Sequence, residues 1–364
     1  MKGLNSLRFF AAFFVILSHA NISLDKLGIY RHSGLAFLNR GGDAVDFFFT
    51  LSGFLITYLL ILEINKTGTV SIKRFYLRRI FRIWPLYFLI VLLGFLILGW
   101  LYPKIYGSNY FSFSIVDGLL MFVLFIPNYA ASNYPVGLLN PLWSIGVEEQ
   151  FYLFWAPLVK FFRRWLLYMI VIFLLFSSLF YVLVDSGLVA VSPQWKKFLL
   201  TQKFYAMAIG SVFAYVLYHY YDVYNKSIFS TRYGQLLILL IVAGHYLIGF
   251  SFSDSLLFKI LLALLYGLLI MNVSVVKIKI INIEHPVLAY LGVISYGIYM
   301  YHMLVDYFLR MMIPAIRTYL PVEILIGAYY LMLILITVLI AALSYRYFEK
   351  FFLNMKNRFH NEST

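Results

Sequence analysis

Long apolar stretches alternate with short polar loops along almost the whole chain. About 20 helical residues cross a hydrocarbon core of roughly 30 Å, and most of these stretches approach that length. Unpaired backbone groups cannot face lipid, so the pattern predicts an all-α fold, a polytopic bundle of about ten transmembrane helices. The predicted spans cover residues 6–22, 43–62, 81–101, 147–162, 166–184, 203–220, 234–250, 257–272, 287–307 and 324–347.

One apolar stretch is too short to be a span. Residues 115–126 make up only about a dozen positions, which predicts a re-entrant or interfacial helix. They lie in a long polar and aromatic loop, residues 102–144, and long ordered loops often carry function. The sequence contains no visible repeat, so we expect one membrane-embedded domain over residues 1–350 and a short cytoplasmic tail over residues 351–364.

The composition agrees with a membrane protein, because 63% of the residues are hydrophobic, 12% are charged and the mean hydropathy is +0.86. The chain has no cysteine, which excludes disulfides, thiolate metal sites and a cysteine nucleophile. A formal net charge of +14 would suit a nucleic-acid partner. The basic residues lie in loops between apolar spans, however, where they set membrane orientation, so we expect membrane lipids and no nucleic acid as partners.

Basic side chains are concentrated on one side of the predicted bundle. The loops at residues 66–82, 160–164, 226–232 and 277–279 and the tail from residue 346 onward hold most of them. Lys and Arg are enriched in cytoplasmic loops, so this asymmetry predicts that both termini are cytoplasmic.

Six ionisable side chains are expected in the outer half of the membrane. They are His19, Asp43, Asp46, Glu148, Glu149 and His302. At 1.5 Å per residue, His19 lies roughly 18 Å along the first helix and His302 roughly 22 Å from the inner end of the ninth. Ionisable groups inside a membrane are costly and are therefore functional candidates. One shared polar site would suit removal of a proton from a hydroxyl by histidine, as acyl transfer to an alcohol requires.

Structural interpretations of the two histidines remain open. His19 could be a hydrogen-bond donor between packed helices. His302 could bond across a helix interface or lie among interfacial tyrosines. The shared depth of the six groups favours a catalytic role for His19, whereas both interpretations of His302 stand.

Three arginines, Arg78, Arg79 and Arg82, crowd the inner entrance of the third predicted span. Most such clusters are topology signals. Arg79 and Arg82, however, share one helical face, and guanidinium groups there could bind the phosphates of a nucleotide cofactor. Glu148 and Glu149 begin the fourth span, where one carboxylate complements the helix macrodipole. Adjacent helical residues point about 100° apart, so these two cannot face the same partner.

Six segments of the chain, in order, resemble the acyltransferase type 3 family of bacterial membrane enzymes. They read LNSLRFFAAFFVILSHA, DFFFTLSGFLIT, FYLRRIFRIWPLY, LNPLWSIGVEEQFYLFW, LGVISYGIYMYH and SYRYFEK. The resemblance covers nearly the whole chain and implies about ten spans in the bacterial inner membrane. It implies transfer of an acyl group from acyl-CoA, with acetyl-CoA the expected donor, to a hydroxyl of an envelope carbohydrate or glycolipid.

The same resemblance implies roles for individual residues. It makes His19 the catalytic histidine, places Arg79 and Arg82 at the inner face, and points to Glu149 as part of the site. The predicted set is His19, Glu149 and His302 as catalytic residues, Arg78, Arg79 and Arg82 as acyl-CoA-binding residues, and Asp46 and Trp143 as acceptor-binding residues. No metal is expected.

The sequence also departs from the family pattern. Asn5 and Ser6 stand where many relatives have Asp and Gly, and Phe351 stands where Pro is common. These changes leave His19 and the arginine pair untouched, so they bear on subgroup and acceptor rather than on the reaction. Some relatives carry an appended extracytoplasmic esterase-like domain, and we expect this chain to be a stand-alone member.

Two other functions would also place charge inside a membrane. A transporter or flippase for an envelope glycolipid would do so, but transporters often have paired repeats and broken helices, which this chain lacks at the sequence level. An acyltransferase that uses a lipid acyl chain would transfer a long chain instead of acetyl. Within the acetyl-CoA hypothesis, both direct transfer and a relay through an acylated nucleophile such as His19 are open.

Overall fold

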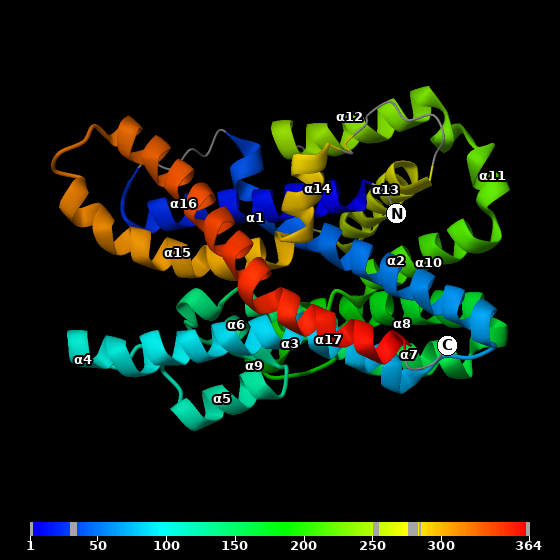
Figure 1. Ribbon diagram of the computed structural model, residues 1–364, viewed down its shortest axis with the longest axis horizontal. Helices are drawn as coiled ribbons and strands as arrows, with labels where there is room; N and C mark the ends of the chain where they lie inside the picture. Colours follow the sequence, from blue (N-terminus) through cyan, green and yellow to red (C-terminus); the bar gives the residue numbers. More distant parts are fainter. Residues whose placement is uncertain (1–2, 30–34, 250–254, 276–282, 284, 362–364) are drawn as a thin grey trace.

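The computed structural model describes residues 3–29, 35–249, 255–275, 283 and 285–361, and all regular elements in these ranges are helices (Figure 1). The longer helices are α1 (Leu4–Lys26), α2 (Gly41–Thr67), α3 (Ile72–Gly94), α7 (Leu142–Phe161), α8 (Leu166–Asp185), α10 (Phe204–His219), α12 (Arg232–Ile248), α13 (Leu256–Val275), α15 (Ser295–Ile316), α16 (Val322–Ser344) and α17 (Lys350–Asn361). The shorter ones are η1 (Ala36–Asn39), the π-helix η2 (Phe95–Leu101), α4 (Tyr102–Tyr106), α5 (Ile115–Val123), α6 (Pro127–Asn133), η3 (Gly137–Leu139), η4 (Arg163–Trp165), α9 (Pro193–Leu200), α11 (Tyr221–Asn225), η5 (Ile228–Ser230), α14 (Pro286–Val293) and the π-helix η6 (Tyr345–Glu349).

The all-helical prediction is confirmed, but the number of about ten spans is not. Each predicted span overlaps at least one helix, with residue 250 outside the described residues, yet only six helical stretches of the described chain are long and apolar enough to cross a membrane. They are Leu4–Lys26, Gly41–Thr67, Ile72–Tyr106, Arg163–Asp185, Leu256–Ser274 and Val322–Met355. A seventh would be the pair α14 and α15, which are bent by 67° at their junction.

The remaining predicted spans fall short for identifiable reasons. α10 has 16 residues and α12 has 17, which is less than the roughly 20 that a span needs. α7 has 20 residues but carries Glu148, Glu149 and Gln150 in its first half. Residues 115–126, expected to be re-entrant or interfacial, contain α5, which is only nine residues long. Its membrane position stays a prediction.

Local sequence accounts for several helix ends. The Ser114 hydroxyl accepts a hydrogen bond from the Asp117 backbone N–H at 3.0 Å and begins α5. The Ser71 hydroxyl does the same for α3, accepting from the Arg74 N–H at 3.5 Å. α2 ends at Gly68, whose φ of +75° is a left-handed conformation that glycine adopts without strain.

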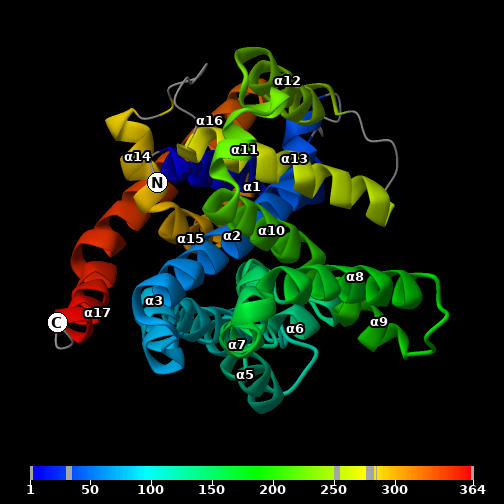
Figure 2. The ribbon, with the colours of Figure 1, turned by 90° about the vertical axis from the view of Figure 1, so that its right-hand side faces the viewer.

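Helix α2 lies in the middle of the bundle (Figure 2). It contacts α1, α7, α10 and α13. It crosses α10 closely because each helix has a glycine at the contact. A Cβ at Gly53 of α2 would clash with the Met207 carbonyl, and one at Gly210 of α10 would clash with the Thr50 carbonyl. Small residues allow such close approach between membrane helices.

The two ends of the described chain and the α2–α3 connection lie at the same end of the bundle (Figure 1). Residues 351–361 of the predicted tail lie in α17, which contacts α3, and residues 362–364 are outside the described residues. The helix α1 contacts α15, and both contact α16. This arrangement places the first-helix histidine against the histidine of α15.

Candidate active site

The two predicted catalytic histidines lie together between α1 and α15. His302 Nε2 is 3.2 Å from His19 Nδ1, and the ring centroids are 5.0 Å apart. His302 is fully buried, whereas the side chain of His19 is partly accessible. Two residues 283 positions apart in the sequence therefore form one unit.

Backbone carbonyls determine which ring nitrogens of this pair carry hydrogen. His302 Nδ1 is 2.6 Å from the Tyr299 carbonyl oxygen, which can only accept, so this nitrogen is the donor and Nε2 of the neutral ring is an acceptor. His19 Nδ1 faces two acceptors, His302 Nε2 and the Val15 carbonyl at 3.0 Å, so it must donate. In neutral His19 the lone pair is therefore on Nε2, which makes no hydrogen bond to any described residue.

A cavity of about 190 Å³ lies between α1, α2, α3, α7 and α15. Neither His19 nor His302 lines it. Its wall on α2 runs from Val45 to Leu59, about 21 Å of helix. Ser144 and Tyr299 also line it, and their hydroxyls are 2.7 Å apart. The Tyr299 carbonyl accepts a hydrogen bond from His302 Nδ1, so Tyr299 contacts both the cavity and the histidine pair.

Three arginines, Arg8, Arg79 and Arg82, also line the cavity. Arg79 and Arg8 are half-buried, and Arg82 is exposed. Arg79 Nε is buried and has no hydrogen-bond partner among the described residues. Guanidinium groups that converge on one space, with a donor unused, could hold phosphate oxygens through charge-assisted hydrogen bonds.

Next to the arginines the cavity has a polar wall on α2 and α7. The Tyr152 hydroxyl is 2.9 Å from Glu148 Oε2 and 2.5 Å from the Ser52 hydroxyl. The Arg79 guanidinium lies over the Tyr152 ring, 5.9 Å from its centroid. Tyr152 therefore contacts both the Glu148 carboxylate and the Arg79 guanidinium, so one aromatic side chain connects the two charged groups.

The neighbouring carboxylate has a different environment. Glu149 Oε2 accepts a hydrogen bond from Trp84 Nε1 at 3.0 Å, while its Oε1 is buried without a partner in the described part of the chain. Glu149 does not line the cavity, whereas Glu148 does. The prediction that the two face different partners is thus confirmed, and the cavity is on the side of Glu148.

Arg78 does not share the cavity with the other predicted arginines. Its Nη2 is 2.8 Å from Glu63 Oε2 of α2, an ion pair between neighbouring helices. Arg78 therefore already has a carboxylate partner. The third arginine that lines the cavity, besides Arg79 and Arg82, is Arg8 of α1.

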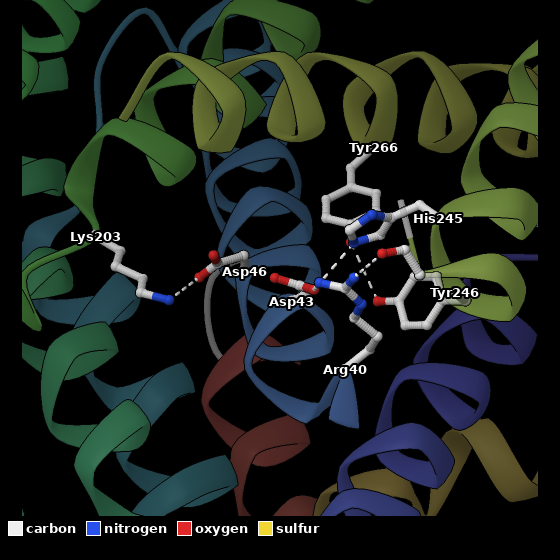
Figure 3. A network of polar contacts seen from close by, with 8 residues as sticks. Arg40, Asp43, Asp46, Lys203, His245, Tyr246 and Tyr266 are labelled. Atoms are coloured by element: carbon white, nitrogen blue, oxygen red, sulfur yellow. Dashed lines mark hydrogen bonds and ion pairs between the residues drawn. The ribbon is translucent and has the colours of Figure 1, made fainter. Parts of the chain in front are cut away.

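The two predicted acceptor-binding residues have different partners. Asp46 is buried, and its Oδ1 forms an ion pair with Lys203 Nζ at 2.6 Å (Figure 3). Trp143 packs edge-on against the Phe49 ring, with 5.9 Å between ring centroids. Neither belongs to the cavity lining.

Asp43 belongs to the same network as Asp46. Its Oδ2 is 3.0 Å from His245 Nε2 and 3.4 Å from Arg40 Nη1 (Figure 3). The network lies where α2 meets α10 and α12. In this network Lys203 and Arg40 pair with the two carboxylates, which the sequence had placed near His19 and His302.

The expectation that six ionisable groups could share one polar site is therefore corrected. They occupy three places: the histidine pair, the Asp43 and Asp46 network, and the two glutamates near the arginines. Similar depth along different helices does not bring side chains together unless they also face the same direction.

Arg8 is the site residue that the sequence interpretation missed. It stands eleven positions before His19 on α1, just over three full helical turns, so both lie on the same face of that helix. A single arginine on an apolar helix, in phase with a histidine, was the signal that could have identified it. Within the described ranges, no group of three or more His, Asp or Glu side chains could hold a metal ion.

Residues 1–346 match the model of a protein family described as an acyltransferase domain. The chain is 29% identical over 169 residues to the peptidoglycan O-acetyltransferase OatA of Listeria monocytogenes, a match covering 45% of this chain and 25% of that protein. It is also 29% identical over 171 residues to the O-acetyltransferase OatA of Staphylococcus aureus, covering 44% and 25%. The matched part thus spans about a quarter of each of these two relatives. No solved structure matches the chain.

Proposed function

Because the chain belongs to this acyltransferase domain family, we propose that it transfers an acyl group, acetyl from acetyl-CoA, to a hydroxyl of an envelope carbohydrate or glycolipid. The observation that carries the proposal is the hydrogen-bonded histidine pair, which is joined through Tyr299 to a cavity lined by three arginines. The names of the two OatA relatives support an acetyl group, and peptidoglycan in one of them supports a carbohydrate acceptor.

His19 is the proposed general base. Its Nε2 lone pair takes the proton of the acceptor hydroxyl as that oxygen attacks the thioester carbonyl. The C–S bond then breaks, and the imidazolium returns the proton to the departing thiolate of coenzyme A. His302 accepts the Nδ1–H of His19 throughout, which orients the base and stabilises its charged form.

The arginine end of the cavity is the proposed donor site. Arg79, Arg82 and Arg8 would bind the phosphates of acetyl-CoA, and the narrow space along α2 would hold its long arm with the thioester towards the histidines. About 16 Å of α1 separates Arg8 from His19. Arg78, already paired with Glu63, would act in topology and helix packing instead.

The enzyme would lie in the bacterial inner membrane with both termini cytoplasmic. The basic loops and the location of both chain ends at one end of the bundle support this orientation (Figure 1). The donor would then enter from the cytoplasm and the acceptor from the opposite side, near residues 102–144. An outward-facing reporter fused at Lys73 would contradict this topology.

The proposed reaction is tested by mass spectrometry of surface glycans from strains with and without the gene. We expect a set of glycan fragments to lose one acetyl group when the gene is deleted and to regain it on complementation. Unchanged glycans, together with no acetyl transfer by the purified protein, would overturn the proposal. Loss of a whole glycan or its accumulation inside the cell would instead indicate a flippase.

The two glutamates of α7 should differ in their effects. The sequence favoured Glu149, but Glu148 lines the cavity, so we now expect Glu148→Gln to lower kcat/KM about tenfold. Glu149→Gln can keep the bond from Trp84 and should affect transfer less. Steady-state kinetics of both folded variants provides the measurement. The opposite ranking would return the functional role to Glu149.

A further inference from the structure

A second hydrogen bond joins α1 to α15, next to the histidine pair. The Ser23 hydroxyl donates to Asp306 Oδ2 at 3.0 Å. Ser23 is four residues after His19, and Asp306 is four residues after His302. Residues four apart are neighbours on one helical face, so the two bonds form consecutive rungs between the helices, about 6 Å apart.

The carboxylate of Asp306 ties three helices together. Besides the Ser23 bond, Tyr329 of α16 donates to Oδ1 at 2.5 Å, and Arg310 Nε is 2.9 Å from Oδ2. Asp306 is fully buried and Ser23 nearly so. A buried carboxylate with several donors resists displacement, because moving it would leave polar groups unpaired.

The position of this carboxylate matters for the proposed chemistry. When His19 accepts a proton, a positive charge appears on a ring that is bonded only to a carbonyl and to neutral His302. Asp306 lies on the adjacent rung, one helical turn from His302, and its carboxylate is also paired with Arg310. A fixed negative charge near a developing positive charge stabilises the transition state without reorganisation.

We propose that Asp306 is a positioning residue for the reaction: through Ser23 it sets the register of α1 against α15, and through its charge it supports protonated His19. The proposal rests on the role proposed above for His19. Asp306 does not touch the reacting atoms. It acts on the histidine pair from one turn away.

Two variants separate the charge from the register. Asp306→Asn keeps the shape and one acceptor but removes the charge, and we expect kcat to fall about 10- to 100-fold, because protonated His19 loses a nearby negative charge. Ser23→Ala keeps the Asp306 charge but removes the hydrogen bond between α1 and α15, and we expect kcat to fall about fivefold. In both variants KM for acetyl-CoA should stay within about twofold, because the donor site is at the arginines.

Tyr301→Phe is the matched control. The Tyr301 hydroxyl bonds to the Ser344 hydroxyl of α16 at 3.0 Å, so this variant also removes an interhelical bond of α15, next to His302 in sequence. If α15 needed only general anchoring, all three variants would lower the folded fraction and leave kcat per folded molecule unchanged. We expect an unchanged kcat for Tyr301→Phe alone.

The outcomes separate this inference from the proposed function. Wild-type kcat in folded Asp306→Asn and Ser23→Ala, with His19→Ala inactive, would overturn the positioning role only. Activity in His19→Ala would overturn the catalytic assignment itself. If Asp306→Asn does not fold, Ser23→Ala decides. In a His19→Ala background, Asp306→Asn should reduce the residual rate little further, because both act through the same group.

Discussion

Replacing His19 by alanine is expected to reduce acetyl transfer per folded molecule by about 100- to 10,000-fold, the usual loss for a general base. The reason is geometric. The Val15 carbonyl and His302 hold the hydrogen of His19 on Nδ1, which leaves Nε2 as the lone pair for the acceptor proton. Transfer from radiolabelled acetyl-CoA to a glycan acceptor measures the rate, with folding checked by size exclusion in detergent.

His245→Ala is the matched control for this variant. His245 is a buried histidine with a polar partner, Asp43 of α2, but it belongs to the Asp43 and Asp46 network and not to the histidine pair. We expect its removal to cost about 1 kcal/mol of stability and to leave the rate per folded molecule near that of wild type. His19→Ala should still bind acetyl-CoA in calorimetry. Equal activity of both variants would assign His19 to helix packing.

Arg79→Lys is expected to raise KM for acetyl-CoA about tenfold, with a smaller change in kcat. Lysine keeps the positive charge but loses the planar fork that binds phosphate in a bidentate manner. A lost hydrogen bond to a charged group accounts for an effect of this size. Arg79 is chosen because it lines the cavity and its Nε is unused within the described chain. Initial rates over a range of acetyl-CoA concentrations give the result.

The adjacent Arg78→Lys variant provides the comparison. Arg78 carries the same charge on the same helix but is paired with Glu63, so we expect nearly wild-type KM. KM for the acceptor should be unchanged in both variants. Equal KM for acetyl-CoA in wild type and Arg79→Lys would mean that the cluster acts in membrane topology alone.

The helical class and the family could be predicted from the sequence because both depend on local information. Hydropathy over about 20 residues identifies helices that meet lipid, and every predicted span overlaps a helix, although residues 287–307 cover both α14 and α15. Short motifs on those helices carried the resemblance that the family match over residues 1–346 confirms. The number of spans was harder to predict. The helix α7 is long and largely apolar, but it carries two carboxylates that bond to protein side chains and is not among the candidate spans.

What only the tertiary structure decided is which polar side chains meet. By sequence, His19, Asp46 and Glu148 lie at a similar depth, but the first pairs with α15, the second with Lys203 and the third lines the arginine cavity. Depth follows from position along a single helix, which the sequence determines. Which side chains contact each other depends on the rotation of each helix about its axis and on close crossings such as that of α2 with α10. Both arise from packing among segments far apart in the chain.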